Sequence, residues 1–462
     1  MLFEPSVYHS RREKLKNEIQ TGVAIFIGNR ELPMNYAANT FPFRQDSTFL
    51  YFFGHAIPNI AAIIDFDENK EILFGDNFEI DDIIWIGQQP SMQQLATEVM
   101  VKETLPFDQI DNYLKGRNIH FIFPYQAENQ IFLSQILNLP IEQLKTRASI
   151  QLIKAIVQLR SVKEEIEIEQ IENACDIGVK MHLAVMQSCH AGISERYLAG
   201  MAEGISLSYG NGVSFPIILS QHGETLHNHC HDGILQAGKL LLMDAGATNL
   251  YHYTSDYTRT IPVDGNFTTR HQELYEIVLR ANTEAIKASK PGVFYRDIHL
   301  LAAQIVATGL KELGLMKGDI KEAVQEGAHA LFFPHGLGHQ LGLDVHDMEN
   351  LGENYVGYDD TITRSTTFGL AALRMARELK TGFIITVEPG IYFIPELIDI
   401  WKIERKFEQF LNYEKIESYK DAGGIRIEDD ILITENGCRI LGPALPKTVE
   451  EVTETVKKGL RL

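Results

Sequence analysis

The sequence contains few cysteines and no long apolar segment. Four cysteines occur among 462 residues, and no two of them form a Cys-x-x-Cys pair or a spacing typical of a disulfide framework. This usage is typical of a reducing compartment. No apolar run is long enough to cross a bilayer, and the first residues lack the apolar core of a signal peptide. We therefore expect a cytoplasmic protein.

Positive charge is also scarce. Lys and Arg number 42 against 62 Asp and Glu, which gives a formal net charge of −20. An excess of negative charge repels polyanions, so nucleic acid and anionic membrane surfaces are disfavoured as partners. Apolar residues (45%) and charged residues (23%) are otherwise present in ordinary proportions. The length predicts two domains with ample hydrophobic cores.

The first 160 residues alternate short apolar runs with turns and helical segments. The apolar runs are rich in β-branched and aromatic residues and have the length of buried strands. Such alternation predicts an α/β domain with a mixed sheet. We expect strands at 23–27, 61–64 and 119–123, and helices at 11–20 and 91–101.

One stretch of this first domain, Phe43–Tyr51, mixes charged and aromatic residues in an unusual way. We interpret it as the beginning of a strand that packs Phe49 and Tyr51. Direct contact with a substrate is the alternative interpretation.

A domain boundary is expected near Ser161, which gives the domains 1–160 and 161–462. Ser161 is a candidate helix N-cap, with Glu164 three residues later as its capping-box partner. The segment from Glu164 to Ser188 keeps apolar residues at helical spacing and is the longest amphipathic segment of the chain. This pattern of helices and strands predicts an α+β fold for the second domain. Its further helices are expected at 272–288 and 295–313, and its strands at 239–244, 257–262, 383–387 and 431–434.

Acidic residues and histidines of the second domain stand beside apolar strands and in glycine-rich loops. Asp244 ends one apolar strand and Asp256 begins the next after a turn, so an antiparallel hairpin would bring both carboxylates together. Close carboxylates repel each other in a site of low dielectric, and a divalent cation relieves this repulsion. Glu388 lies at a strand end.

Further candidate ligands lie later in the chain. Glu428 stands in a strand beside Arg426, which could orient an acid. His339, within a glycine-rich run, offers one nitrogen donor. Four carboxylates and one imidazole form a hard, anionic set that suits a pair of divalent ions. We expect the neighbouring Asp429 and Asp430 to be solvated surface charges.

Six ordered motifs together resemble the pita-bread metallopeptidases that act on Xaa-Pro bonds, the aminopeptidase P and prolidase family. The segment Phe43–Phe49 is similar to the signature of their N-terminal domain, so the resemblance covers nearly the whole chain. It implies an N-terminal α/β domain followed by a C-terminal catalytic pita-bread domain. The motifs are Leu242–Gly246, Ser255–Thr260, His335–His339, Asp344–Asp347, Val387–Tyr392 and Gly424–Asp430.

The resemblance also implies a ligand set and residue roles. It implies two divalent ions, usually manganese, that activate a water and polarise the scissile carbonyl, with Asp256 and Glu428 in the shared positions. Glu388 is expected to transfer protons, and His346 or His227 to stabilise the oxyanion. The two aspartates are 12 residues apart (256 − 244) instead of the usual eleven, an extra residue that the intervening turn can absorb. The implied ligands are Asp244, Asp256, His339, Glu388 and Glu428, the histidines of the substrate site are His227, His335 and His346, and the substrate-binding set is His227, His346, Arg374 and Arg426.

Details of the sequence point to two activities within the family. An insert at 401–420 is more typical of prolidase. Arg374 matches an arginine that in prolidases holds the free carboxylate of a dipeptide. The alternative interpretation of Arg374 is an arginine on the surface of a helix. The first domain is more typical of aminopeptidase P. We predict an Xaa-Pro aminopeptidase that cleaves proline-containing peptides as a homo-oligomer (dimer or tetramer).

Three alternatives stay open. The first is an Xaa-Pro dipeptidase. The second is a metal-free pita-bread binding module, although such proteins typically lack several ligands. The third is a zinc site at the histidine cluster His227–His231, which is disfavoured because alternate residues of a strand point to opposite faces.

Overall fold

The computed structural model describes residues 3–461, which form two compact units. Unit 1 runs to residue 160 and also includes 348–355, and unit 2 holds the rest of the chain. Within unit 1, the Asn350 side-chain amide donates a hydrogen bond to the carbonyl of Phe123 at 3.1 Å. None of the helices in the described residues is both long and apolar enough to span a bilayer.

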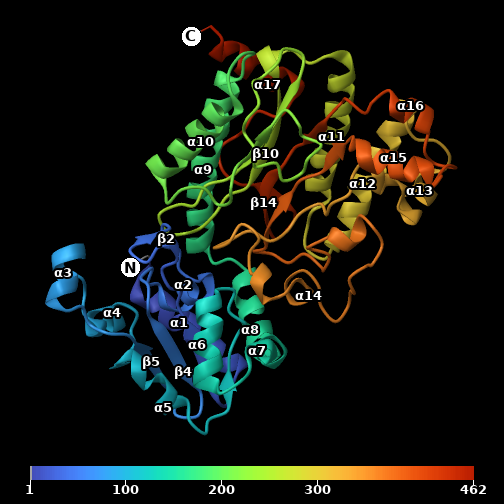
Figure 1. Cartoon of the computed structure of the whole chain (residues 1–462). Coiled ribbons are helices and arrows are strands. Elements are labelled where there is room, and N and C mark those ends of the chain that lie inside the picture. The colour runs from blue at the N-terminus through green and yellow to red at the C-terminus, as the bar shows by residue number, and fades with distance from the viewer. Residues whose placement is uncertain (1–2, 462) are drawn as a thin grey trace. The chain divides into compact units, whose positions relative to one another are not determined.

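Unit 1 is built on a mixed five-stranded sheet with the strand order β6-β5-β4-β1-β7 (Figure 1). β1 pairs antiparallel with β4 and parallel with β7, while β5 pairs antiparallel with β4 and parallel with β6. The predicted α/β domain with a mixed sheet is confirmed, although the expected strand 119–123 is shorter. The elements are α1 (Pro5–Glu18), β1 (Val23–Ile27), β2 (Pro33–Tyr36), β3 (Asn39–Thr40), α2 (Ser47–Phe53), β4 (Ala61–Asp65), β5 (Lys70–Phe74), α3 (Ile80–Ile86), α4 (Met92–Glu98), β6 (Glu103–Leu105), α5 (Ile110–Leu114), β7 (Ile119–His120), α6 (Ala127–Leu137), α7 (Ile141–Arg147) and α8 (Ile150–Ser161).

The strand expected to begin within Phe43–Tyr51 is wrong, because this stretch leads into helix α2. Asp46 caps the helix, since its carboxylate accepts the backbone N–H of Phe49 at 2.9 Å. Every residue of Ser47–Phe53 is buried. A fully buried helix shows no amphipathic period, so its apolar run resembles a strand in the sequence.

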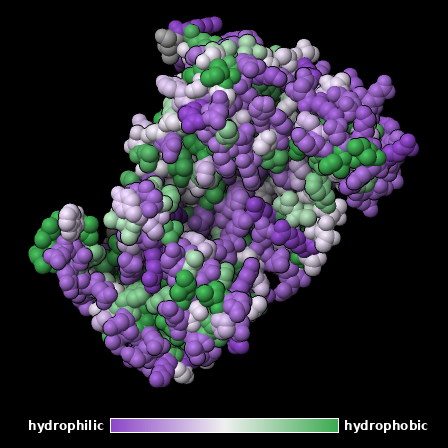
Figure 2. All heavy atoms as spheres, in the orientation of Figure 1, coloured by the Kyte–Doolittle hydropathy of each residue, from purple (hydrophilic) through white to green (hydrophobic). Residues whose placement is uncertain are grey.

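Helix α3 contributes no buried residue to unit 1. Its apolar side chains are exposed instead: Ile80 and Ile84 are each 70% exposed and Trp85 is 86% exposed. Green apolar atoms cover this helix in Figure 2. A capping box between Glu79 and Asp82 holds its first turn.

The last residue of β4, Asp65, carries a fully buried carboxylate. Burial alone would raise its pKa, but hydrogen bonds from Tyr113, from the Glu68 amide and from Arg117 outweigh this and lower the pKa of Asp65. Arg117 Nη2 lies 2.7 Å from Asp65 Oδ1. The pair therefore ties the central strand to the segment that precedes β7.

We expect Asp65→Asn to lower the free energy of unfolding at pH 7 by about 3 kcal/mol. Breaking a buried ion pair typically costs roughly 3–5 kcal/mol, and we expect the lower value because Arg117 keeps some solvent contact. A carboxyl whose pKa is lowered by folding stabilises the native state above its unfolded pKa, near 3.9, and loses this contribution at lower pH. The difference between variant and wild type should therefore shrink below about pH 4 in urea unfolding. Asp111→Asn, at an exposed position of α5, is the control, and an equal effect of both substitutions would contradict the assignment.

Unit 2 combines three small antiparallel sheets with long helices. The strand orders are β10-β9-β8, β11-β14-β15 and β12-β13. An isolated bridge between Thr258 and Glu428 joins the first sheet to the chain just before β14. In Figure 1 the pair α9 and α10 lies on one side of these strands and the pair α11 and α12 on the other. The elements are α9 (Glu165–Ser188), α10 (Glu195–Tyr209), β8 (Ile218–Ser220), β9 (Leu240–Ala245), β10 (Tyr257–Pro262), α11 (Thr269–Ala288), α12 (Tyr295–Glu312), α13 (Ile320–Glu326), α14 (Glu353–Val356, which begins within unit 1), β11 (Ile384–Val387), β12 (Gly390–Tyr392), α15 (Pro395–Ile403), α16 (Tyr413–Glu417), β13 (Gly424–Arg426), β14 (Asp429–Ile433), β15 (Cys438–Ile440) and α17 (Val449–Gly459).

The expected N-cap of the long helix α9 is wrong by three residues. Glu164 is the N-cap, and Glu167 completes a capping box with it. Ser161 is instead the last residue of α8, and its hydroxyl accepts a hydrogen bond from Arg377 at 2.8 Å. The sequence carries two overlapping capping-box patterns here, and the structure uses the second.

Candidate active site

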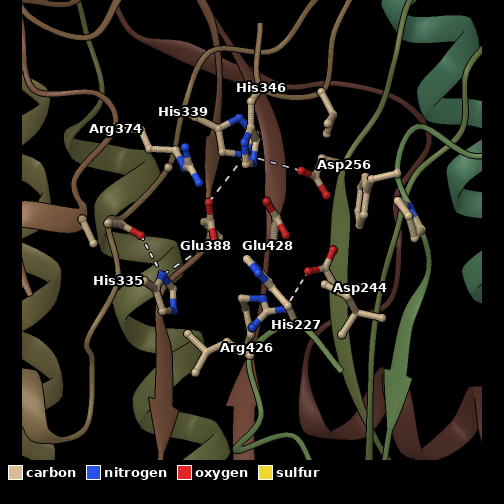
Figure 3. Close-up of a pocket in the computed structure, with 18 of the residues that line it drawn as sticks. His227, Asp244, Asp256, His335, His339, His346, Arg374, Glu388, Arg426 and Glu428 are labelled. Atoms are coloured by element: carbon tan, nitrogen blue, oxygen red, sulfur yellow. Dashed lines mark hydrogen bonds and ion pairs between the residues drawn. The ribbon is translucent and has the colours of Figure 1, made fainter. Parts of the chain in front are cut away.

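The predicted site residues line one cavity of about 450 Å³ in unit 2 (Figure 3). Apolar side chains, among them Phe215, Ile218 and Leu226, form part of its wall. Polar side chains converge on the rest of it from strands and loops far apart in the sequence. Those predicted from the sequence are His227, Asp244, Asp256, His335, His339, His346, Arg374, Glu388, Arg426 and Glu428.

The predicted hairpin of two aspartates is confirmed. β9 pairs antiparallel with β10, with Asp244 opposite Thr258 and Ala245 opposite Tyr257. Asp244 therefore lies at the end of β9 and Asp256 just before β10, and both side chains face the cavity in Figure 3. Asp244 is 8% exposed and Asp256 is 4% exposed.

Two further acids and a histidine complete the cluster. One donor atom each of Asp256, His339 and Glu428 lies within 4.8 Å of the others. His339 Nε2 lies 3.4 Å from Asp256 Oδ2 and 3.6 Å from Glu388 Oε1. Such spacings suit side chains that share one cation.

The electrostatics of these acids favour a bound cation. Burial, followed by the repulsion of neighbouring carboxylates, raises the pKa of Asp256 and of Glu428. Burial also raises the pKa of Glu388. Within the described residues, Oδ1 of Asp244 and Oδ1 of Asp256 are buried and accept no hydrogen bond. Buried acceptors of this kind are costly unless a ligand satisfies them, so the residues fit divalent metal ions.

The glycine-rich run places His339 through close backbone packing. The segment 337–339 runs beside β11: the Glu388 N–H donates to the Leu337 carbonyl at 2.8 Å, and the Thr386 N–H donates to the His339 carbonyl at 3.0 Å. A Cβ on Gly338 would lie 2.1 Å from the Thr386 carbonyl oxygen. Glycine at 338 is therefore required for His339 to lie next to Glu388.

The other histidines line the cavity beside this cluster. His335 Nε2 lies 2.8 Å from the Tyr392 hydroxyl, and burial lowers the pKa of His335 to about 3, so its ring is neutral. The rings of His346 and His339 lie with centroids 4.1 Å apart. His227 is exposed within the cavity, and partial burial followed by the charge of Arg426 lowers its pKa.

Arg426 contacts an acid, as the sequence suggested, and this acid is Asp244. Its Nη2 donates to Asp244 Oδ2 at 2.6 Å, its Nη1 to the Tyr392 hydroxyl at 2.8 Å and its Nε to Thr258 Oγ1 at 3.0 Å. The Thr258 hydroxyl in turn donates to Glu428 Oε2 at 2.6 Å. Arg426 thus orients Asp244 directly and Glu428 through Thr258.

Arg374 lies between Ala372 and β11 and belongs to no helix. The alternative interpretation, an arginine on the surface of a helix, is therefore wrong. Its side chain lines the cavity and points toward Glu388 in Figure 3. A positive charge here faces the acids across the space that a ligand would fill.

The expectation that Asp429 and Asp430 are solvated surface charges is wrong, because both are buried in β14. Asp429 Oδ1 lies 2.7 Å from Arg259 Nη2, and Asp429 Oδ2 lies 2.6 Å from Lys447 Nζ. Asp430 Oδ2 accepts the backbone N–H of Asp256 at 2.9 Å. Asp430 thus supports Asp256 directly, and both acids are held by partners distant in the sequence.

Sequence reasoning also missed a buried ion pair behind His346. Lys163 Nζ lies 2.8 Å from Asp347 Oδ2, and both side chains are 1% exposed. Lys163 lies near the start and Asp347 at the end of the first of the two segments that form unit 2, 161–347, so only the burial of the pair in the fold reveals this role.

The zinc alternative at the histidine cluster finds no support in the structure. His229 Nδ1 lies 3.4 Å from the Ile217 carbonyl oxygen, and His231 Nδ1 lies 3.0 Å from the Leu219 carbonyl oxygen. Neither of the two groups of potential metal ligands found within residues 3–461 includes them. These rings attach their loop to the chain around β8.

Comparison with known proteins places both units in described families. Residues 169–435 match the model "Metallopeptidase family M24", and residues 8–119 match "Aminopeptidase P, N-terminal domain". An Xaa-Pro dipeptidase of Homo sapiens is 31% identical over 94% of this chain and 88% of its own length. A probable Xaa-Pro aminopeptidase of Sordaria macrospora is 32% identical over 98% of this chain and 96% of its own.

Solved structures agree with the sequence relatives. A variant of Escherichia coli aminopeptidase P in complex with substrate superposes with a TM-score of 0.82 at 26% identity, covering 100% of both chains. The same enzyme with the inhibitor Pro-Leu gives the same score and coverage. The predicted fold, an N-terminal α/β domain followed by a pita-bread domain, is confirmed. Because a family model spans most of unit 2 and these relatives match almost the entire chain, the protein belongs to metallopeptidase family M24 and, within it, to the aminopeptidase P and prolidase family of Xaa-Pro peptidases.

Proposed function

We propose that this protein is an Xaa-Pro aminopeptidase, which releases the N-terminal residue of peptides with proline in the second position. The cluster of four buried or half-buried acids around His339, inside a cavity with apolar walls, carries the proposal. The full-length similarity to aminopeptidase P structures supports the choice of an aminopeptidase. Proline's tertiary amide has no N–H, so a site for it needs an apolar wall that receives the ring.

We assign five metal ligands for two divalent ions, for which Mn²⁺ is the proposed species. When bound, the ions would activate a water molecule at neutral pH and polarise the scissile carbonyl. Oxygen donors with a single imidazole are the ligands expected for such hard ions. The ligands are Asp244, Asp256, His339, Glu388 and Glu428.

One of these ligands, Glu388, and the other polar side chains of the cavity act on the substrate. Glu388 lies 3.6 Å from His339 Nε2 and 3.8 Å from His335 Nδ1, at the centre of the site, where its carboxylate can move a proton to or from the attacking water. His346 or His227 donates to the developing oxyanion, and the neutral His335 is held by Tyr392. Arg426 keeps Asp244 in place.

One observation favours a second candidate, an Xaa-Pro dipeptidase. Arg374 lines the cavity, where it could hold the free carboxylate of a substrate that ends at proline. A longer peptide offers a neutral carbonyl at that position and gains less. A charge-assisted contact of this kind contributes about 1.5–3 kcal/mol.

The two candidates give opposite expectations for Arg374→Ala. As an aminopeptidase, the wild type should cleave an Xaa-Pro-Yaa tripeptide at least as well as the matched Xaa-Pro dipeptide, and the variant should leave this ratio nearly unchanged. A dipeptidase would favour the dipeptide by roughly ten- to a hundredfold in kcat/KM, and the variant would erase the preference. We would measure kcat/KM for one matched pair in both proteins, with Arg280→Ala, an exposed arginine of α11 outside the cavity lining, as the control. A strong dipeptide preference that disappears in Arg374→Ala would replace the proposed activity by the second one.

A further inference from the structure

The chain between β8 and β9 brings histidines to the cavity without a helix or strand of its own. Residues 221–233, here called the His227 loop, carry both His227 and His229 to the cavity lining. His227 is exposed within the cavity and needs a fixed backbone to hold a defined position. Preorganised donors are effective in catalysis only when their support is rigid.

A buried acid outside the cavity lining holds both ends of this loop. Glu195, the first residue of α10, is 2% exposed. Its Oε1 accepts the backbone N–H of Gln221 at 2.7 Å, and its Oε2 accepts the backbone N–H of Gly233 at 3.2 Å. The Glu195 N–H also donates to the Gly233 carbonyl at 2.9 Å. One side chain therefore closes the loop at its base.

The two segments approach closely at Gly233, where a larger side chain would displace the Glu195 carboxylate. A Cβ on Gly233 would lie 2.7 Å from the carboxylate carbon of Glu195. Within the described residues, Glu195 forms no ion pair, so its charge is stabilised by N–H and O–H donors of the loop and of β8. Hydrogen bonds to an ionised acceptor are stronger than those between neutral groups, which gives this closure its strength.

A short relay continues from Glu195 to the neighbour of His227. The Ser220 hydroxyl donates to Glu195 Oε1 at 3.4 Å and accepts a hydrogen bond from Asn228 Nδ2 at 3.1 Å. Asn228 Oδ1 then accepts the backbone N–H of Cys230 at 3.0 Å. The peptide next to His227 is thus connected to the buried acid by two side-chain hydrogen bonds.

We propose that Glu195 is a positioning residue of this peptidase, which fixes the His227 loop so that the His227 imidazole faces the reacting carbonyl. The expected effect on kcat rests on the proposed function, because it requires that the protein cleaves Xaa-Pro peptides. The closure of the loop by Glu195 is a separate claim with its own readout.

Glu195→Gln tests both claims, because the carboxamide keeps the shape of the side chain but replaces one acceptor oxygen by an NH₂ group. We expect faster hydrogen exchange of the Gln221 and Gly233 amides, unchanged metal content, and a fall of about tenfold in kcat with little change in KM, since a charged acceptor is lost and one N–H remains unpaired. Glu203→Gln, an exposed acid of the same helix, is the matched control and should change none of these quantities.

A double-mutant cycle separates positioning from a general loss of stability. In a His227→Ala background, Glu195→Gln should cost no further activity, because its effect acts through the missing imidazole. An additive loss would overturn the proposal, as would unchanged exchange at both amides. If Glu195→Gln does not fold, Ser220→Ala removes only the hydroxyl between Glu195 and Asn228, and the same double-mutant cycle with His227→Ala can be measured. A wild type that is inactive on Xaa-Pro peptides would refute the proposed function, and the exchange data would still decide the closure of the loop.

Discussion

Asp256→Asn is expected to abolish hydrolysis of Xaa-Pro peptides and to weaken metal binding. At the same time, the metal-free protein should be as stable as wild type or more stable. These opposite effects follow from one charge. Burial is the largest cause that raises the pKa of Asp256. Repulsion by the charges of Asp244, Asp430 and Glu388 raises it further. A neutral amide relieves this repulsion, but it also removes the proposed ligand that two cations would share.

The measurements are kcat/KM on an Xaa-Pro-Yaa peptide, metal content after dialysis, and thermal unfolding with and without a chelator. Chelator should inactivate the wild type, and Mn²⁺ should restore its activity. Asp297→Asn removes an exposed acid that pairs with its neighbour Arg296, and it should behave as wild type. Full activity in Asp256→Asn, or in wild type shown to be free of metal, would refute the metal assignment.

His346→Ala should retain its metal ions and lose turnover. Its ring lies beside that of His339, with centroids 4.1 Å apart, yet it is absent from the group of close donor atoms formed by Asp256, His339 and Glu428. A donor to the oxyanion acts mainly in the transition state, and removing one typically costs about 3 kcal/mol, or roughly a hundredfold in kcat.

Metal content and kcat measured on the same preparation distinguish this role from ligation. His190→Ala, which removes an exposed histidine of the surface, controls for the substitution itself. If His346→Ala lost metal in parallel with activity, His346 would be a ligand and the proposed set of five would have to change.

The sequence was informative wherever neighbouring residues determine the structure. The strands 23–27 and 257–262 occur at their expected bounds, and the hairpin from Asp244 to Asp256 follows from two apolar strands with a turn between them. Helices α11 and α12 differ from expectation by only a few residues at their ends. Local pattern and tertiary packing agree at these places.

Prediction failed where the deciding partner is distant in the chain. Asp429 and Asp430 look like solvated acids until Arg259, Lys447 and the amide of Asp256 are brought against them. Helix α2 looks like a strand because burial on all sides removes its amphipathic period. No local pattern reports such contacts, so the residues that support the site are harder to predict than those that line it.

The grouping of residues 348–355 with unit 1 bears on how the molecule can be taken apart. A shortened protein that began at residue 161 would still contain this segment, but it would lack Phe123, whose carbonyl accepts the hydrogen bond from Asn350. A chimera that exchanged only residues 1–160 with a relative would create the same mismatch. The segment also begins directly after His346 and Asp347, so any disturbance would start next to a cavity histidine. Exchange of the whole first unit therefore requires two grafts, one covering residues 1–160 and one covering residues 348–355.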